Sequence, residues 1–263
     1  MERAQQGPRA RYREQTRAEI KDLALRQLAE GGGTALALTR IAKEMGLSGP
    51  ALYRYFTGRD DLLNALIRDA YDDAAAAMAR AAARSAKGSR GVRARLHDLA
   101  EAYRAWAVAE PHRYLLLQGA PIPGYVAPPD TLERARAVLG PFLPLFATGN
   151  PGPAVAATVD EMTAWLTAEE SVRAWVAQYA PEAAEAAEAA EATEPAEAAE
   201  VTGAGGAVTA AAAHALAGAV LAWAQLHGSV SLEVAGQFAG MAHRGGTLLG
   251  AQMELLADAF GLE

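Results

Sequence analysis

Apolar side chains recur at intervals of three and four residues along most of this chain, and no strand-length segment alternates with period two. A first amphipathic helix is predicted over residues 14–29, where Ile20, Leu23, Ala24 and Leu28 share one face and three glycines follow. The pattern therefore predicts an all-α protein.

The same periodicity predicts further helices, separated in several places by glycine and proline clusters. They are expected over residues 39–45, a short stretch after Ser48, and residues 59–83, 92–108, 111–118, 129–146, 154–178, 207–227 and 230–256. We expect a boundary near residues 86–91, between an N-terminal domain of residues 14–86 and a C-terminal domain of residues 87–263. Ahead of both, Arg9, Arg11 and Arg13 predict a flexible basic arm over residues 1–13.

Residues 38–56 have the pattern of a helix-turn-helix, in which two short helices are joined by a tight turn. Gly46 permits a sharp exit from the first helix, Ser48 is expected to cap the second with its side chain, and Pro50 is tolerated in the first turn. A second helix of about eight residues, roughly 12 Å long, suits the major groove of DNA. Leu52 and Phe56 are predicted to point into the core.

The surface left by this core has the chemistry of DNA recognition. Small side chains permit close approach, arginine reads guanine or holds phosphate, and tyrosine hydroxyls bind phosphate. The candidate DNA contacts are Thr39, Arg40, Ser48, Gly49, Pro50, Ala51, Tyr53, Arg54, Tyr55 and Arg59. Two alternatives stay open: ordinary packed helices with a solvated charged face, or a helical adaptor that uses the motif for protein contacts. Salt dependence separates DNA binding from the adaptor, because binding to phosphates weakens as salt rises.

The segment over residues 17–67 resembles the DNA-binding domain of the tetracycline-repressor (TetR) family. The resemblance rests on Leu38-Thr39, Ile41-Ala42, Gly46-Leu47-Ser48, Ala51-Leu52-Tyr53, Tyr55-Phe56 and Asp61-Leu62-Leu63. Two departures are mild: Tyr55 stands where histidine is frequent, and Thr57-Gly58 replaces the more usual proline-serine, which suggests a weaker cap for the next helix.

The C-terminal part is similar to the Trp-His-Gly subfamily of TetR ligand domains, through Trp223, His227-Gly228 and the earlier Glu110-Pro111 and Tyr114. The resemblance implies a three-helix DNA-binding domain followed by a helical-bundle domain for ligand binding and dimerisation. It also implies a homodimer formed through the last two long helices, 207–227 and 230–256. Such a dimer would bind a palindromic operator in double-stranded DNA, usually as a repressor, and a small-molecule effector would release it.

Charge is unevenly divided along the chain. The net charge is −7, yet residues 1–59 hold eleven Lys and Arg against six Asp and Glu, which gives +5 and leaves −12 for the remainder. A basic N-terminal segment followed by an acidic remainder is consistent with binding to nucleic acid through the N-terminal segment. The chain has no cysteine, so disulfides are excluded and a cytoplasmic location is expected.

Two segments of biased composition lie toward the C-terminus. Residues 201–232 carry no full charge, but they are rich in alanine and glycine and flanked by Glu200 and Glu233, so we expect a helix buried between protein surfaces and no membrane span. Glutamate occupies every third position from residue 182 to residue 200. That period leaves no apolar face on a helix, which predicts a solvated or disordered insertion over residues 182–204.

Aromatic residues of the C-terminal domain are candidates for an effector pocket, although aromatics at helical spacing more often form core. The candidates are Tyr103, Trp106, Tyr114, Phe142, Phe146 and Trp165. No phosphate-binding glycine loop, nucleophile elbow or zinc-protease motif is present, and the histidine spacing matches no metal site. The sequence thus predicts no enzyme, no cofactor and no metal.

Overall fold

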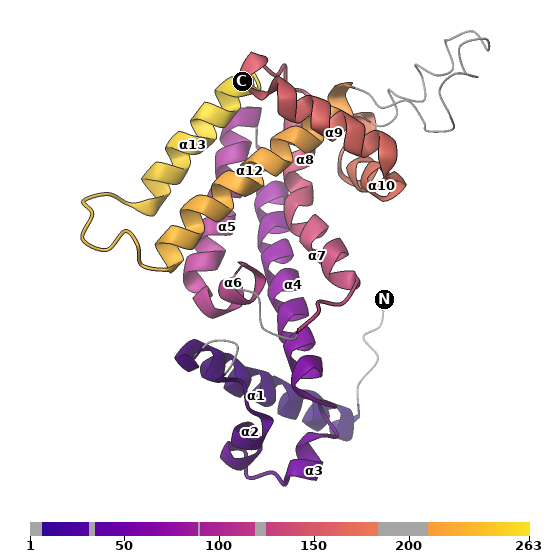
Figure 1. Cartoon of the computed structure of the whole chain (residues 1–263), viewed down its shortest axis with the longest axis vertical. Helices are drawn as coiled ribbons and strands as arrows, with labels where there is room; N and C mark the ends of the chain where they lie inside the picture. Colours follow the sequence, from indigo (N-terminus) through magenta and orange to yellow (C-terminus); the bar gives the residue numbers. More distant parts are fainter. Residues whose placement is uncertain (1–6, 32–34, 89, 119–124, 184–209) are drawn as a thin grey trace, which may run out of the picture. The chain divides into compact units, whose positions relative to one another are not determined.

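The computed structural model describes residues 7–31, 35–88, 90–118, 125–183 and 210–263. Every regular element in these ranges is helical, so the predicted all-α class is confirmed (Figure 1). Most of the predicted glutamate-rich insertion, residues 184–204, lies outside the described residues, as do residues 1–6 of the predicted arm.

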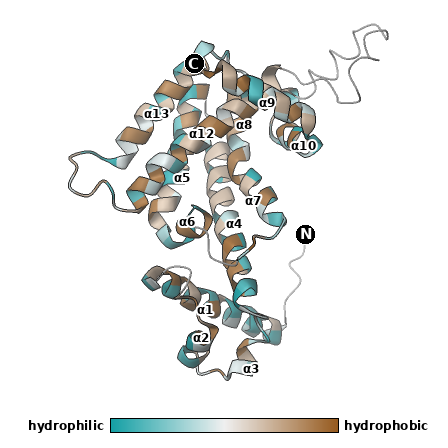
Figure 2. Cartoon of the chain, viewed as in Figure 1, coloured by the Kyte–Doolittle hydropathy of each residue, from teal (hydrophilic) through white to brown (hydrophobic). Residues whose placement is uncertain are grey.

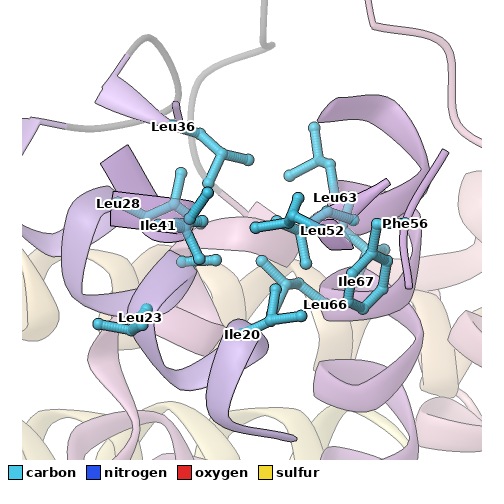
Figure 3. Close-up of a cluster of buried hydrophobic side chains, with 13 residues drawn as sticks. Ile20, Leu23, Leu28, Leu36, Ile41, Leu52, Phe56, Leu63, Leu66 and Ile67 are labelled. Atoms are coloured by element: carbon cyan, nitrogen blue, oxygen red, sulfur yellow. The ribbon is translucent and has the colours of Figure 1, made fainter. Parts of the chain in front are cut away.

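The chain divides into two compact units, and the first comprises residues 1–72 and 110–131. It contains α1 (Pro8–Gly31), α2 (Leu38–Glu44), α3 (Gly49–Leu52), the first half of α4 (Arg59–Ala86) and α6 (Pro111–Gln118). Side chains from the segment spanning α1 to α4 form one apolar core, to which Ile41, Leu52 and Phe56 all contribute (Figure 3). This core fixes the mutual arrangement of the first four helices.

The second unit comprises residues 73–109 and 132–263. It contains the second half of α4, α5 (Val92–Ala109), most of α7 (Asp130–Leu139), α8 (Leu143–Ala147), α9 (Ala156–Ala168), α10 (Glu170–Tyr179), α12 (Ala210–Val234) and α13 (Gly245–Ala259). Helix α12 is its central element, because α5, α8, α9 and α13 all pack against it.

Helix α12 is apolar along most of its length (Figure 2). By length and composition alone it could cross a bilayer, but half of its most apolar window is buried inside the protein. A core helix of a soluble protein passes the same test, so this property is weak evidence for a membrane span.

Several predicted boundaries are corrected. Helix α1 begins at Pro8, so Arg9, Arg11 and Arg13 lie in its first turns and not in a flexible arm. Proline is well suited to a first helical position, and the polar, exposed residues that follow give no apolar period to reveal the helix. The predicted helix over 129–146 is divided by a 3-10 turn at Gly140–Phe142, where Pro141 lacks an N–H.

Two other helices also differ from the prediction. The predicted helix over 154–178 is interrupted at Glu169, whose extended backbone separates α9 from α10. Conversely, α12 continues through Gly228 to Val234, and α13 begins only at Gly245. The turn between them starts near Gly236, whose φ is +70° and favours glycine. The helices expected over 207–227 and 230–256 therefore correspond to Ala210–Val234 and Gly245–Ala259.

The division between the units also differs from the boundary predicted at residues 86–91. It falls inside α4, between Asp72 and Asp73, and places residues 110–131 with the first unit. Contacts distant in sequence explain the grouping: the Arg68 guanidinium donates to both carboxylate oxygens of Asp130 at 2.8 and 3.1 Å, and the Tyr125 hydroxyl donates to Asn64 Oδ1 at 2.6 Å. The local pattern could not reveal these pairs.

Candidate nucleic-acid interface

The turn between α2 and α3 is closed by the backbone. Gly46 has φ +64°, and its N–H donates to the Lys43 carbonyl at 3.2 Å, while the Leu47 N–H donates to the Ala42 carbonyl at 2.9 Å. These paired bonds form a Schellman motif, which requires a left-handed residue and explains the glycine. Helix α2 thereby ends and α3 begins at Gly49, three residues after Gly46.

The start of α3 differs in two ways from the prediction. Ser48 occupies the N-cap position with extended backbone, but its side chain makes no capping hydrogen bond. Regular α-helix covers only Gly49–Leu52, four residues and not about eight, with Pro50 in the first turn as expected. Tyr53 to Tyr55 continue as a hydrogen-bonded turn, in which the Tyr55 N–H donates to the Leu52 carbonyl at 2.8 Å. We call residues 49–55 the recognition segment.

The buried side chains of the recognition segment decide which others are exposed. Leu52 is 1% exposed and Phe56, directly after the segment, is 0% exposed, so both belong to the core in Figure 3. Tyr53 is 52% exposed, and Arg54 is exposed beside it. Gly49 and Pro50 are exposed as well, whereas Ala51 and Tyr55 are half-buried. The segment thus presents small residues at its start and a tyrosine and an arginine at its end.

The Arg40 guanidinium already forms ion pairs with two carboxylates of the same chain. It lies 2.8 Å from a carboxylate oxygen of Glu30 and 3.0 Å from one of Glu44. The hydrogen bond to Glu30, with the weaker effect of Glu44, holds the pKa of Arg40 above its ordinary value. Thr39 is exposed beside it. A phosphate that binds Arg40 must therefore compete with two carboxylates.

The predicted contact Arg59 lies at the beginning of α4, with its guanidinium 3.6 Å from the Asp60 carboxylate. Two residues further, the Asp61 carboxylate accepts hydrogen bonds from the Thr57 N–H at 2.8 Å and the Thr57 hydroxyl at 3.1 Å. The substitution of threonine-glycine for proline-serine is thus compensated by Asp61, which ties down the turn before α4. Asp61 was not predicted as a structural residue of this turn.

Two arginines of α1 contact the end of the recognition segment, and the sequence analysis did not predict this role. Arg17 Nη1 donates to the Tyr55 carbonyl at 2.5 Å, and the Arg17 guanidinium lies over the Phe56 ring, 4.2 Å from its centroid. Arg13 Nη2 donates to the Arg54 carbonyl at 3.4 Å. Their spacing of four residues on one helix was the only available signal.

The predicted effector residues are divided between the two units. Tyr114 is buried in the first unit, whereas the other five belong to the second, and Trp165 is 39% exposed. Four of the aromatic side chains are buried in the second unit: Tyr103, Trp106, Phe142 and Phe146. Ring centroids lie 5.7 Å apart for Tyr103 and Trp106, and 4.9 Å apart for Phe146 and Phe260, distances typical of packed rings. Their role in effector binding stays a prediction.

A surface hollow of about 430 Å³ lies in the second unit. Its lining comes from α4, α5 and Arg90 in the connection between them, and includes the polar side chains Arg84, Ser85, Arg90, Asp98 and Glu101. None of the six predicted aromatic residues lines it. Among the described residues, no group of three potential metal ligands comes together.

Both the N-terminal and the C-terminal part of the chain match models of known protein families. Residues 20–66 match the model of bacterial regulatory proteins of the tetR family, and residues 96–256 match the tetracyclin repressor-like C-terminal domain. The HTH-type transcriptional regulators Mb1846 of Mycobacterium bovis and Rv1816 of Mycobacterium tuberculosis are each 42% identical over 144 residues, which cover 54% of this chain. The match spans 61% of the length of these relatives.

Two solved structures are similar over nearly the whole chain. The regulatory protein SCO4313 is 39% identical, with a TM-score of 0.68 and coverage of 95% of this chain and 99% of that one. A protein of unknown function from Rhodococcus sp. RHA1, 22% identical with a TM-score of 0.54 and 94% coverage of both chains, shares the fold. The matched family consists of transcriptional regulators and not of enzymes. The chain belongs to the tetR family of bacterial regulatory proteins.

Proposed function

We propose that this protein is a sequence-specific, DNA-binding transcriptional repressor of the cytoplasm. It binds a palindromic operator as a homodimer, and a small-molecule effector releases it. The observation that carries the proposal is the recognition segment, where Tyr53 and Arg54 are exposed directly beside the buried Leu52 and Phe56. Rigidly supported polar side chains next to a tight turn are what base reading requires.

The candidate DNA contacts divide into base-reading and phosphate-binding groups. Gly49, Pro50 and Ala51 permit close approach and apolar contact with thymine methyl groups, while Arg54 pairs with guanine. Tyr53 supplies a hydroxyl beside it. Phosphate contacts are assigned to the residues that surround the segment: Thr39, Arg40, Ser48, Tyr55 and Arg59.

Dimerisation is supported by the surface of the last two helices. Leu232 on α12 and Leu248 and Leu255 on α13 are 44%, 37% and 68% exposed, although the two helices pack together. Large apolar side chains exposed on neighbouring helices favour association with a second copy. A two-fold dimer would place two recognition segments about 34 Å apart, the repeat of B-DNA, and so demands a palindrome.

Selection from a random duplex pool at moderate salt tests the proposal. The reading variant carries Tyr53→Ala with Arg54→Ala. A matched control carries Arg11→Ala with Tyr12→Ala, which removes the same residue types from exposed positions of α1. We expect the wild type and the control to enrich the same palindrome, and the reading variant to enrich none.

Two results would contradict the proposal. Failure of the folded wild-type protein to enrich any duplex would remove the DNA-binding function, unless extraction of a co-purified effector restores enrichment. Binding that does not weaken as salt rises would instead favour protein contacts through the helix-turn-helix, because phosphate contacts release counterions.

A further inference from the structure

The end of the recognition segment has little support from its own helix. Regular helix stops at Leu52 after four residues, and the carbonyl groups of a helix's last turn have no partner within it. Such groups need donors from outside, or the last turn frays. Tyr53 and Arg54, the exposed polar side chains of the segment, lie in the hydrogen-bonded turn that follows Leu52.

Arg17 supplies the outside donor from α1. Its guanidinium donates to the Tyr55 carbonyl at 2.5 Å and lies 4.2 Å from the centroid of the Phe56 ring. A hydrogen bond from a charged donor is stronger than one from a neutral donor, and a guanidinium over an aromatic face is favoured by the ring quadrupole. Arg17 therefore holds two consecutive residues by two different interactions.

The position of Arg17 is itself fixed. Ile20, one turn further along α1, is fully buried in the core that also contains Phe56. Arg17 is half-buried, so its guanidinium is only partly screened by water. Arg13, one turn earlier, adds a longer hydrogen bond of 3.4 Å to the Arg54 carbonyl. Helix α1 thus supports the backbone at both Arg54 and Tyr55.

We propose that Arg17 is a positioning residue for DNA recognition: it fixes the backbone of the recognition segment's last turn and so the direction of Tyr53 and Arg54. This inference rests on the proposed DNA-binding function. It differs from a direct role of Arg17 as a phosphate ligand, which would weaken binding to every sequence alike and lower the salt dependence by about one counterion.

The test compares three single variants in the full chain. Arg17→Met keeps the aliphatic stem but loses the donors and the charge, and Arg17→Lys keeps the charge but loses the planar group. Arg11→Met removes the same charge from an exposed position of the same helix. Affinity for the selected operator and for a scrambled duplex is measured at several salt concentrations. Hydrogen exchange of the peptide spanning residues 53–56 is measured without DNA.

We expect Arg17→Met to weaken operator binding about tenfold, while binding to the scrambled duplex falls no further than in Arg11→Met. Arg17→Lys should restore scrambled binding but not operator binding. Exchange over residues 53–56 should be faster in Arg17→Met and unchanged in Arg11→Met. An equal loss on both duplexes, restored by lysine, would overturn the proposal and make Arg17 a phosphate ligand.

The exchange measurement separates this inference from the proposed function. If the wild type selects no operator while Arg17→Met still accelerates exchange over residues 53–56, then the DNA-binding function fails and the structural support remains. If exchange is unchanged in Arg17→Met, the positioning role is overturned whatever the protein binds.

Discussion

Gly218 gives a sharp test of the packing of the second unit. It is buried in α12, where an added Cβ atom would lie 2.6 Å from Phe146 Cβ on α8 and closer still to two ring carbons. Phe146 is fully buried, and its ring meets the Phe260 ring edge-on with centroids 4.9 Å apart. The phenyl group has no room to move aside, so we expect Gly218→Ala to destabilise the protein.

The magnitude follows from two opposing effects. Alanine is favoured over glycine inside a helix by about 1 kcal/mol. Overpacking a tight core costs about 1–3 kcal/mol or more. We expect a cost at the upper end of this range, because the overlap includes Phe146 Cβ, which side-chain rotation does not move. The free energy of unfolding should thus fall by about 2 kcal/mol, and the Tm by roughly 4–8 °C for a chain of this size.

Urea unfolding followed by circular dichroism, at a fixed protein concentration, measures the change. Gly250→Ala is the matched control, because an added Cβ there meets no atom within 4 Å inside α13, so stability should rise by about 1 kcal/mol. In a Phe146→Ala background, Gly218→Ala should cost much less, since most of the overlapping atoms are gone. If Gly218→Ala stabilises the protein as Gly250→Ala does, the reasoning about α8 and α12 is refuted.

Three further predictions concern charge and association. Glu44→Gln should raise operator affinity about threefold at low salt and steepen its salt dependence, because Arg40 loses one of two carboxylate partners; unchanged affinity in anisotropy titrations would contradict this. Leu255→Glu, at a side chain 68% exposed, should shift the proposed dimer toward monomer in ultracentrifugation without loss of helicity. The hydrogen bond from Arg93 holds the pKa of Glu254 below its ordinary value of 4.5, so this carboxylate stabilises the fold above that pH. Its contribution is lost as pH falls below 4.5 and through the lowered pKa of the folded protein, and Glu254→Gln should lack this part of the pH dependence in urea titrations.

The fold could be predicted well wherever local chemistry marks an element. Helix α6 matches the prediction at both ends, because Pro111 is well suited to a helix start. The prediction was wrong where a local signal was outweighed by tertiary contacts: α12 continues through Gly228, since burial of its neighbours Leu226 and Val230 offsets the low helix propensity of glycine. The division inside α4 depends on pairs such as Arg68 with Asp130, 62 positions apart, and no local pattern contains them.

The recognition segment and its neighbours show why the exposure of a side chain is easier to predict than whether that side chain can bind DNA. The spacing of Leu52 and Phe56 settles which neighbours can face the core, so the exposure of Tyr53 and Arg54 follows from local geometry. Whether an arginine is available to DNA depends on partners elsewhere: Arg40 is held by Glu30, ten residues away, and Arg17 by a carbonyl 38 residues away. A basic residue on the DNA-binding unit can therefore have either of two roles. In the first role, illustrated by Arg40, carboxylates within the protein compete with phosphate for the guanidinium. In the second, illustrated by Arg17, the guanidinium supports the backbone of the recognition segment. Only variants that separate charge from geometry distinguish these roles.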